Sequence, residues 1–466
     1  MNARTRPPTR RGLLWAGAAG TAGTLLLGAC QSGRQGGDAG AGAAPKTVSG
    51  QITWFMRAQA AELPWEQGAV AAFKTQAPDV AVNLETVPAA SEFDSKLTAL
   101  LAAGTAPDVW THWGQSGFGD YFARGLLADL TAFASRDRVD GSTFLPNTFD
   151  VWKRNGKLYG LSFNQRFGTF IYFNKQLFEG AGIPLPPVDW ENRSWTWDSM
   201  VEAARRLTGA GSGGGETFGF GAGAQPGLWG LAYLFGGDFF TKEHYANGVA
   251  RTSNIASPEV LAAMTARAEL MHRHRVYPRP DDLRAAGTSS LTAHFIAGRL
   301  GMLFDTGSEW PRIEQEASFD WGVAAAPRQK DNKVVNFLNP LLLSRDSKNP
   351  EAAWAFMKWH ITEAGQRVLV QHALQPVHRA MLDEYLSGRQ LKQPPADVKR
   401  AIEGAAPHGQ ISPNQLMVDF GAIRTAVDEA MAPTWNGERP AAESLREAKT
   451  KVDAILEESF ARYGGK

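Results

Sequence analysis

Cysteine is almost absent from this chain, with Cys30 the single one among 466 residues. One cysteine cannot form an intramolecular disulfide, and it leaves no cysteine-based metal site. Tyrosine is also scarce, with eight residues and no evident cluster, which argues against an iron site built from tyrosine ligands. The sequence contains no phosphate-binding loop, no nucleophile elbow and no zinc-ligand spacing. We therefore expect neither a cofactor nor a metal.

An excess of charge of either sign is also missing. The 48 Lys and Arg residues include four arginines within residues 1–29, so the remainder carries 44 basic against 47 acidic residues. A protein whose main partner is nucleic acid has a clear basic excess. The balance therefore excludes nucleic acid as the principal partner.

Acidic residues are missing from the N-terminus until Asp38, whereas residues 4–11 hold four arginines. An apolar stretch over residues 12–29 follows and ends in small residues before Cys30. This order predicts a secretory signal. The alternative is a transmembrane anchor, since the stretch is of borderline length for crossing a bilayer. Five glycines within it and the flexible tail that follows it favour the signal.

Two short motifs refine this prediction. Residues 9–14, TRRGLL, resemble the twin-arginine export motif, and residues 27–30, LGAC, resemble the bacterial lipobox. The resemblance implies cleavage before Cys30 and lipidation of its thiol, with the protein anchored at the outer face of the cytoplasmic membrane. Two or more acyl chains hold a protein stably at a membrane. Residues 31–50 are rich in Gly, Ala, Ser and Gln and predict a flexible tether.

Apolar periodicity beyond the tether alternates between strand and helix. Residues 52–55 and 80–84 have strand patterns, and residues 63–77 have the pattern of a helix that ends before Pro78. Ser91 and Asp94 suggest the cap of a second helix. The remaining predicted features are a strand from 108, a helix over 197–207, a loop over 211–215, and helices that start at Pro258, Pro350 and Pro440. This order predicts parallel sheets with crossover helices. The roughly 415 residues beyond the tether suit two lobes.

Several segments resemble the bacterial extracellular solute-binding proteins of the sugar-binding type, the receptors of ABC importers. The most specific is AAGTAPDV at residues 102–109. The others, in the family's order, are residues 73–74 with 78–82, 93 with 96–97, 172–178 with 181–183 and 197–198, 235–238, 295–302, and 321–323 with 327. The resemblance extends over about residues 51–460.

The resemblance implies a two-lobed α/β fold of the periplasmic-binding-protein class II type. Each lobe would be a mostly parallel sheet flanked by helices, with the ligand held in the cleft at the hinge. Lobe one would comprise residues 51–161 and 326–368, and lobe two residues 162–325 and 369–466. The partners implied are a small carbohydrate and the transmembrane subunits of an ABC permease, and we expect a monomer.

Sugars have apolar C–H faces and hydroxyl-rich edges, so a sugar site needs aromatic rings and planar polar side chains. The 15 tryptophans suggest aromatic surface for recognition, although an aromatic-rich core is the alternative for many of them. In lobe one, Trp54 and Arg57 end the first strand, and Trp54 suits the core as well as the site. The loop over residues 111–115 supplies His112, Trp113 and Gln115, of which His112 could instead be structural.

Across the hinge, the resemblance implies ligand contacts from Arg166 and Phe167, from Trp229, and from Glu309 and Trp310. Asn339, near a predicted hinge strand, is a further candidate. The sequence departs from the maltose-binding pattern at residues 227–228 and 421, which are not aromatic, so a long maltodextrin platform is in doubt. Arg57 and Arg166 could bind an acidic sugar such as a uronate, or neutral hydroxyl groups.

A secreted glycan-acting enzyme is the alternative from another class. A glycoside hydrolase needs two carboxylates at a defined separation. Asp305 and Glu309 are available, but no motif pairs them. His272 and His274 do not share a helix face, so they do not predict a metal site. Among binding proteins, a polyamine or a glycerophosphodiester is the alternative ligand.

Overall fold

The computed structural model describes residues 47–58, 63–111, 117–210 and 216–464. Cys30 and the predicted signal and tether lie outside these residues, apart from the end of the tether at 47–50. A five-stranded sheet and a four-stranded sheet organise the described residues, and two short two-stranded ladders accompany them. Among the described residues, none of the helices combines the length and the apolar character needed to cross a bilayer.

The first sheet has the strand order β2-β1-β3-β12-β6. Strands β1, β2 and β3 pair in parallel, and β12 pairs antiparallel with both β3 and β6. Four strands therefore run in one direction and β12 runs against them. The elements of this first lobe are β1 (Gly50–Arg57), α1 (Leu63–Gln76), β2 (Val80–Val87), α2 (Ala90–Ala102), β3 (Val109–Thr111), α3 (Phe118–Ala123), α4 (Thr131–Arg136), η1 (Asp150–Trp152), β4 (Lys153–Arg154), β5 (Lys157–Leu158), β6 (Leu161–Gln165), β12 (Leu338–Leu343), α13 (Pro350–His360) and α14 (Glu363–Gln371).

The second sheet has the order β10-β7-β9-β8, in which β7 alone runs against its neighbours. The chain segment that contains this sheet comprises β7 (Thr169–Asn174), α5 (Lys175–Gly180), α6 (Trp197–Leu207), β8 (Phe218–Ala222), η2 (Pro226–Gly230), α7 (Leu231–Leu234), α8 (Lys242–Asn247), α9 (Pro258–His272), α10 (Pro280–Ala285), α11 (Leu291–Ile296), β9 (Leu300–Thr306), η3 (Gly307–Glu309), α12 (Trp310–Glu316) and β10 (Trp321–Ala324). The predicted mostly parallel α/β architecture is confirmed, with one reversed strand in each sheet.

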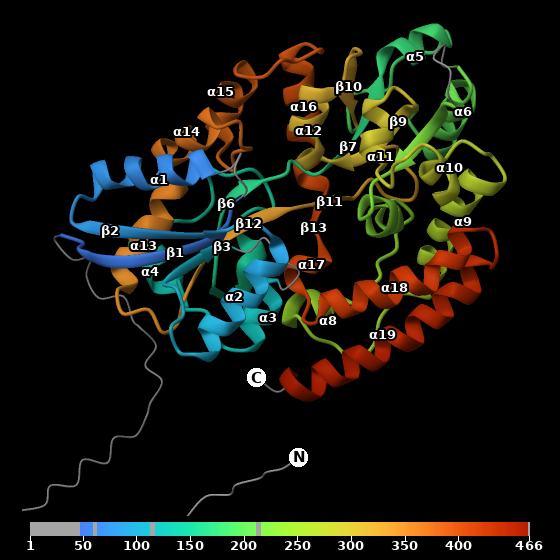
Figure 1. Cartoon of the computed structure of the whole chain (residues 1–466). Helices are drawn as coiled ribbons and strands as arrows, with labels where there is room; N and C mark the ends of the chain where they lie inside the picture. Colours follow the sequence, from blue (N-terminus) through green and yellow to red (C-terminus); the bar gives the residue numbers. More distant parts are fainter. Residues whose placement is uncertain (1–46, 59–62, 112–116, 211–215, 465–466) are drawn as a thin grey trace, which may run out of the picture. The chain divides into compact units, whose positions relative to one another are not determined.

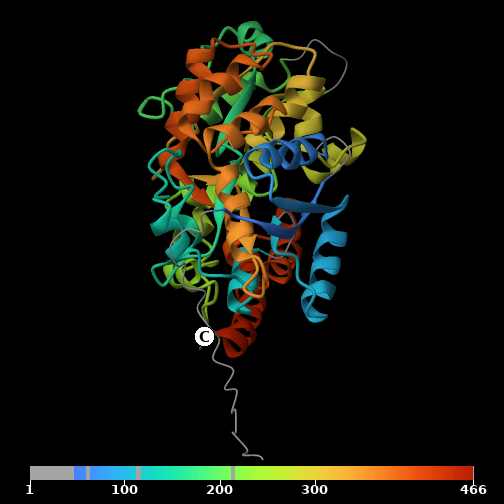
Figure 2. The same ribbon diagram turned by 90° about the vertical axis from the view of Figure 1, so that its left-hand side faces the viewer.

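The later elements connect and cover both sheets. They are β11 (Val334–Asn336), η4 (Arg379–Met381), α15 (Leu382–Ser387), α16 (Pro395–Ala405), η5 (Ala406–His408), β13 (Gly409–Ile411), α17 (Pro413–Leu416), α18 (Phe420–Trp435) and α19 (Ala441–Tyr463). Helices α1 and α2 cover opposite faces of the first sheet (Figures 1 and 2). Helix α16 packs on β7 and β10 of the second sheet, and α18 lies alongside α19.

Local sequence signals set several helix starts. The hydroxyl of Ser257 accepts a hydrogen bond from the Val260 N–H and caps α9, which begins at Pro258 as predicted. Thr196 and Ser199 form a capping box at α6, which spans the predicted residues 197–207. The predicted cap at Ser91 is wrong, because α2 begins at Ala90 and no side chain caps it.

The chain crosses between the sheets in segments that are hydrogen-bonded to one another. We call residues 166–169 and 335–338 the crossing segments. The Arg166 N–H donates to the Phe337 carbonyl (2.9 Å), and the Thr169 hydroxyl donates to the Val335 carbonyl (2.8 Å). The first crossing thus follows β6, a few residues beyond the predicted boundary at 161. The second precedes β12 at 338, later than the predicted 326, because both strands pair within the first sheet.

Helix α3 touches α17, which brings the first lobe against the C-terminal part of the chain. Glycine is required at this contact, since a Cβ on Gly119 would lie 2.1 Å from the Leu416 carbonyl oxygen. The Asp419 N–H donates to the Asp120 carboxylate (3.2 Å) at the same contact. Burial raises the pKa of Asp120 to about 6. This close approach fixes α17 beside the first lobe.

Gln366 is fully buried and bonds four backbone groups near the crossing segments. Its amide N–H groups donate to the carbonyls of Phe163 (2.7 Å) and His360 (2.8 Å). Its carbonyl oxygen accepts from the N–H groups of Val377 (2.9 Å) and His378 (3.2 Å). The side chain thereby joins β6, α13 and the segment that follows α14.

Replacing Gln366 by methionine should lower the free energy of unfolding by about 3 kcal/mol, because buried peptide groups lose their partners. Urea denaturation followed by circular dichroism measures this change. The matched control is Gln371→Met, at an exposed position five residues further along α14. Equal stability of the two variants would contradict the role assigned to Gln366.

Candidate functional site

A cleft of 390 Å³ lies where strand ends of both sheets meet. In open α/β sheets, ligands bind beyond the carboxyl ends of the strands. The cleft follows this rule, since residues at or just after the ends of β1, β6, β8 and β9 line it. The lining residues are Arg57, Arg166, Ala224, Gln225, Pro226, Asp305, Thr306, Ser308, Glu309, Phe337, Asn339, Asn414, Gln415 and Arg424.

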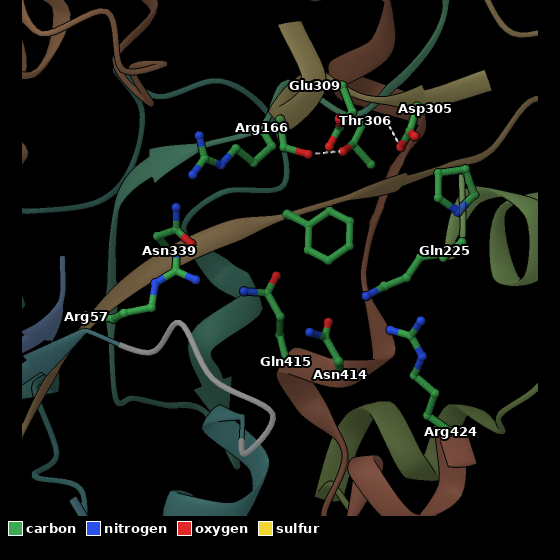
Figure 3. A pocket seen from close by; sticks show the side chains of 14 residues that line it. Arg57, Arg166, Gln225, Asp305, Thr306, Glu309, Asn339, Asn414, Gln415 and Arg424 are labelled. Atoms are coloured by element: carbon green, nitrogen blue, oxygen red, sulfur yellow. Dashed lines mark hydrogen bonds between the residues drawn. The ribbon is translucent and has the colours of Figure 1, made fainter. Parts of the chain in front are cut away.

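One wall comes from the first lobe and the crossing segments. Arg57 is the last residue of β1, and Arg166 directly follows β6. Asn339 lies at the start of β12, and its amide donates to the side-chain oxygen of Asn164. Figure 3 shows the Arg57, Arg166 and Asn339 side chains on the same side of the cleft. This wall therefore combines two guanidinium groups with an amide.

The opposite wall comes from the end of β9 and the turn after it. Asp305 and Thr306 end the strand, and Glu309 follows in η3. The hydroxyls of Thr306 and Ser308 are hydrogen-bonded to each other. In Figure 3 Glu309 and Thr306 lie beside Asp305 on this wall, with Gln225 below them. The wall is thus rich in oxygen acceptors.

The surroundings of Asp305 strongly raise the pKa of its carboxyl group. Its side chain is 9% exposed and accepts from the Thr306 N–H (2.8 Å) and the Thr292 hydroxyl (3.5 Å). Burial, together with the charge of Glu309, raises the pKa of Asp305 to about 7. Glycine at position 223 makes room for it, because a Cβ there would lie 2.1 Å from the Asp305 carboxylate.

Helices α17 and α18 supply the third side. The buried Gln415 side chain accepts a hydrogen bond from the Leu338 N–H (3.0 Å) and donates one to the Leu338 carbonyl. Its amide therefore bonds to Leu338 as the backbone of a neighbouring strand would. Asn414 precedes it and projects into the cleft (Figure 3). The Arg424 guanidinium is hydrogen-bonded to Asp428 (3.2 Å) one turn further along α18. Amides and a guanidinium thus complete a largely polar cavity.

The structure brings four of the predicted site residues together at the cleft: Arg57, Arg166, Glu309 and Asn339. Their side chains are planar polar groups, the type expected to hydrogen-bond to hydroxyl groups. His112, Trp113 and Gln115 lie outside the described residues. Among the described lining residues, Phe337 is the one aromatic side chain.

The other four predicted site residues lie in the hydrophobic core instead, and for them the expected placement needs correction. Trp54 is fully buried, and its indole N–H donates to the Thr111 hydroxyl (3.2 Å). Phe167 packs edge-on against Tyr385, and its left-handed backbone (φ 47°) turns the chain between the sheets. Trp229 and Trp310 are each 1% exposed or less.

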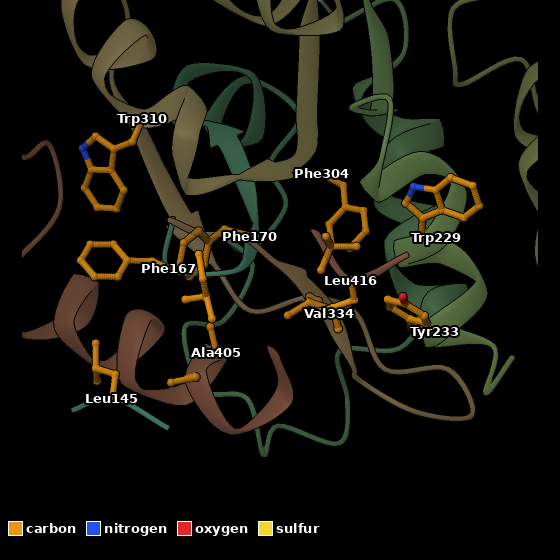
Figure 4. Close-up of a cluster of buried hydrophobic side chains, with 14 of the residues drawn as sticks. Leu145, Phe167, Phe170, Trp229, Tyr233, Phe304, Trp310, Val334, Ala405 and Leu416 are labelled. Carbon is orange, nitrogen blue, oxygen red and sulfur yellow. The ribbon is translucent and has the colours of Figure 1, made fainter. Parts of the chain in front are cut away.

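Both of these tryptophans pack against aromatic neighbours. The Trp229 ring lies 4.6 Å from Phe239 and 5.7 Å from Phe420, and the Trp310 ring lies 5.7 Å from Trp321. Figure 4 shows Trp229 and Trp310 within the cluster of buried side chains. Burial of such large apolar rings is strongly favourable, which explains why they fill the core.

Sequence reasoning missed Gln225, Asn414, Gln415 and Arg424. Gln225 had a detectable signal, since a polar residue just after a strand is a candidate by the strand-end rule. Asn414, Gln415 and Arg424 had no such signal in the sequence, because they belong to helices far along the chain. Only the tertiary structure brings them to the strand ends.

Replacing Trp310 by alanine should lower the free energy of unfolding by about 3–5 kcal/mol, because a fully buried ring leaves a cavity. Trp310→Phe should cost much less, since it keeps most of the contact with Trp321. Guanidinium denaturation measures both. Leu185→Ala, at a side chain that is 44% exposed, is the control and should change stability by about 0.5 kcal/mol or less. A Trp310→Ala protein of control-like stability would show that the ring is not in the core.

The raised pKa of Asp305 predicts a pH dependence of stability. The native state binds this proton more tightly than the unfolded state does. Protonation of Asp305 therefore adds its full contribution to the free energy of unfolding below the ordinary pKa of 3.8, and this contribution is lost as pH rises through about 7. The melting temperature of the wild type, compared with that of Asp305→Asn, should therefore decrease as pH rises from 4 to 7. Calorimetry over pH 4–8 measures it, with the exposed Asp346→Asn as control. A difference independent of pH would contradict the raised pKa.

Comparisons with known proteins agree with this fold. A protein of Brucella abortus (strain 2308) is 25% identical over 414 residues, which covers 84% of this chain and 90% of the relative. An ABC substrate-binding protein of Listeria monocytogenes, solved in complex with cycloalternan, superposes with a TM-score of 0.71 at 25% identity, over 88% of this chain and 99% of that one. A sugar transporter of Rhizobium etli in an open conformation superposes with a TM-score of 0.72 at 18% identity, over 87% of this chain and 100% of that one.

The family model described as bacterial extracellular solute-binding protein matches residues 57–367. The matched residues include Arg57 at the end of β1 and the whole of four further strands that end at the cleft or support it, namely β3, β6, β8 and β9. They also include both crossing segments. The chain therefore belongs to the family of bacterial extracellular solute-binding proteins.

Proposed function

We propose that this protein captures a carbohydrate between its two lobes and delivers it to the membrane permease of an ABC importer. The observation that carries the proposal is the cleft itself. It receives guanidinium, amide and carboxylate groups from the strand ends of both lobes. Such groups can satisfy the many hydroxyls of a sugar. The Listeria relative that binds cycloalternan and the Rhizobium etli sugar transporter support a carbohydrate ligand.

Capture follows from ligand contacts on both walls. A ligand that contacts Arg57 on one wall and Glu309 on the other binds more tightly when the lobes are closed. The closed state is thereby favoured, as in hinge closure around ligands in related binding proteins. The crossing segments are the parts of the backbone that this closure would deform.

The N-terminus supports a membrane-tethered receptor. We infer export through the twin-arginine-like signal, cleavage before Cys30 and lipidation of its thiol. The tether of residues 31–50 would keep the folded lobes close to the permease. Tethering raises the local concentration of the receptor at its partner. The receptor would then act as a monomer at the outer face of the cytoplasmic membrane.

Binding without chemical conversion is the expected activity. A glycoside hydrolase holds its two carboxyl groups on either side of the scissile bond. Asp305 and Glu309 instead come from one strand end and the turn after it, on a single wall. Their placement suits hydrogen bonds to one side of a ligand better than acid and base roles across it.

A thermal-shift screen followed by isothermal titration calorimetry tests the proposal. The panel contains glucose, galactose, maltose, lactose, maltotriose and galacturonate, with spermidine and glycerophosphocholine as non-sugar ligands. A sugar that binds the native state should raise the melting temperature by mass action. Arg166→Gln should weaken that binding by about tenfold or more, which corresponds to the loss of one hydrogen bond to a charged group.

The matched control is Arg312→Gln, whose guanidinium is 44% exposed and pairs with Glu316 on α12. It should leave the affinity for sugar unchanged. Binding of spermidine or glycerophosphocholine alone would contradict the carbohydrate proposal. Hydrolysis of a glycan that is abolished by Glu309→Gln would contradict a purely binding role.

A further inference from the structure

A second cavity adjoins the cleft inside the second lobe. It has a volume of 540 Å³ and shares Ala224 and Asp305 with the cleft. Asp305 therefore borders both cavities. Each falls within the roughly 300–1,000 Å³ typical of small-molecule sites. We call the second one the side cavity.

The side cavity is lined by both apolar and polar side chains. The apolar ones include Leu283, Leu291 and Trp435. The polar ones include Arg267, Thr292 and Asp305. The Arg267 guanidinium lies 4.1 Å from the centre of the half-buried Trp435 ring and donates to the Gly227 carbonyl (3.0 Å). An aromatic ring beside polar groups is the lining that a sugar residue requires.

Asp305 occupies the junction as a hydrogen-bonding group. Asp305 is nine-tenths buried, and its carboxyl group accepts hydrogen bonds from the Thr306 N–H and the Thr292 hydroxyl. The contact with the Thr292 hydroxyl is long, at 3.5 Å. A carboxylate has about four lone-pair positions, so acceptor capacity remains for hydroxyl groups of a ligand. A ligand that passes between the cavities would contact this carboxyl group directly.

We propose that the side cavity is a second sugar subsite, and that the ligand is an oligosaccharide of two or more residues. One residue lies in the cleft between Arg166 and Glu309, and the next enters the side cavity past Asp305 and packs near Trp435. This inference rests on the proposed function, since it assigns the length of the captured carbohydrate. Because Asp305 and Ala224 line both cavities, one extended ligand is favoured over two separate ones.

The test compares ligands that differ only in length. Calorimetry on the purified protein uses glucose, maltose and maltotriose, and galactose and lactose. In the series that binds, the di- or trisaccharide should bind at least about tenfold more tightly than its monosaccharide. Ser289, which is exposed and lines the side cavity, is replaced by tryptophan to fill it. Ser289→Trp should remove that tenfold advantage and leave the monosaccharide affinity unchanged.

Two further variants distinguish a subsite from a structural effect. Ser387→Trp places the same ring at an exposed position that lines neither cavity, and it should leave every affinity unchanged. Trp435→Ala should weaken binding of the longer sugar alone. Melting temperatures of all variants show that each is folded before its affinity is compared.

Three outcomes would overturn the inference. A monosaccharide that binds as tightly as its longer homologues would overturn it while leaving the proposed function intact. So would a Ser289→Trp protein that retains the preference for the longer sugar. Binding by none of the five sugars, and by no galacturonate either, would remove the basis of both proposals together.

Discussion

Hydrogen bonds between the crossing segments are the constraint on which the rest of the structure depends. The Arg166 N–H bonds to Phe337, the Thr169 hydroxyl bonds to Val335, and the Gly168 N–H bonds to the side chain of Asn336 (3.2 Å). These contacts hold the exits from β6 and the approach to β12 side by side. Because both sheets are joined there, their strand ends meet at one cavity. The left-handed Phe167 sits at this turn, where backbone strain is typical of functional sites.

The cleft is built from elements that are far apart in sequence. Arg57 ends β1, Asp305 ends β9, and Gln415 belongs to α17, yet all three line one cavity. The rule that ligands bind at the carboxyl ends of strands explains the first two. Gln415 is there for a different reason, since its side chain completes the hydrogen bonding of Leu338. A structural side chain therefore lies among the residues that line the cleft, and polar side chains occur on every described side of the cleft.

Aromatic residues show where sequence reasoning misplaced function. Trp54, Trp229 and Trp310 were expected at the site, but each is buried among other rings. A tryptophan in a strand-end position satisfies the pattern of a core residue and of a sugar platform equally well. Its rotamer and its neighbours decide between them, and neither is visible in sequence. Trp435, by contrast, lies near the end of α18 with no motif around it and yet lines the side cavity.

Local patterns in the sequence determined the alternation of strands and helices, the helix starts at Trp197 and Pro258, and the polar residues at the ends of β1 and β6. These features depend on neighbours within a few residues, so periodicity and capping chemistry suffice to predict them. The tertiary structure alone decided which aromatic rings are buried, that α17 and α18 complete the cleft, and that Asp305 lies between two cavities with a raised pKa. Burial and long-range contacts set these properties, because desolvation and packing depend on residues that only the folded chain brings together.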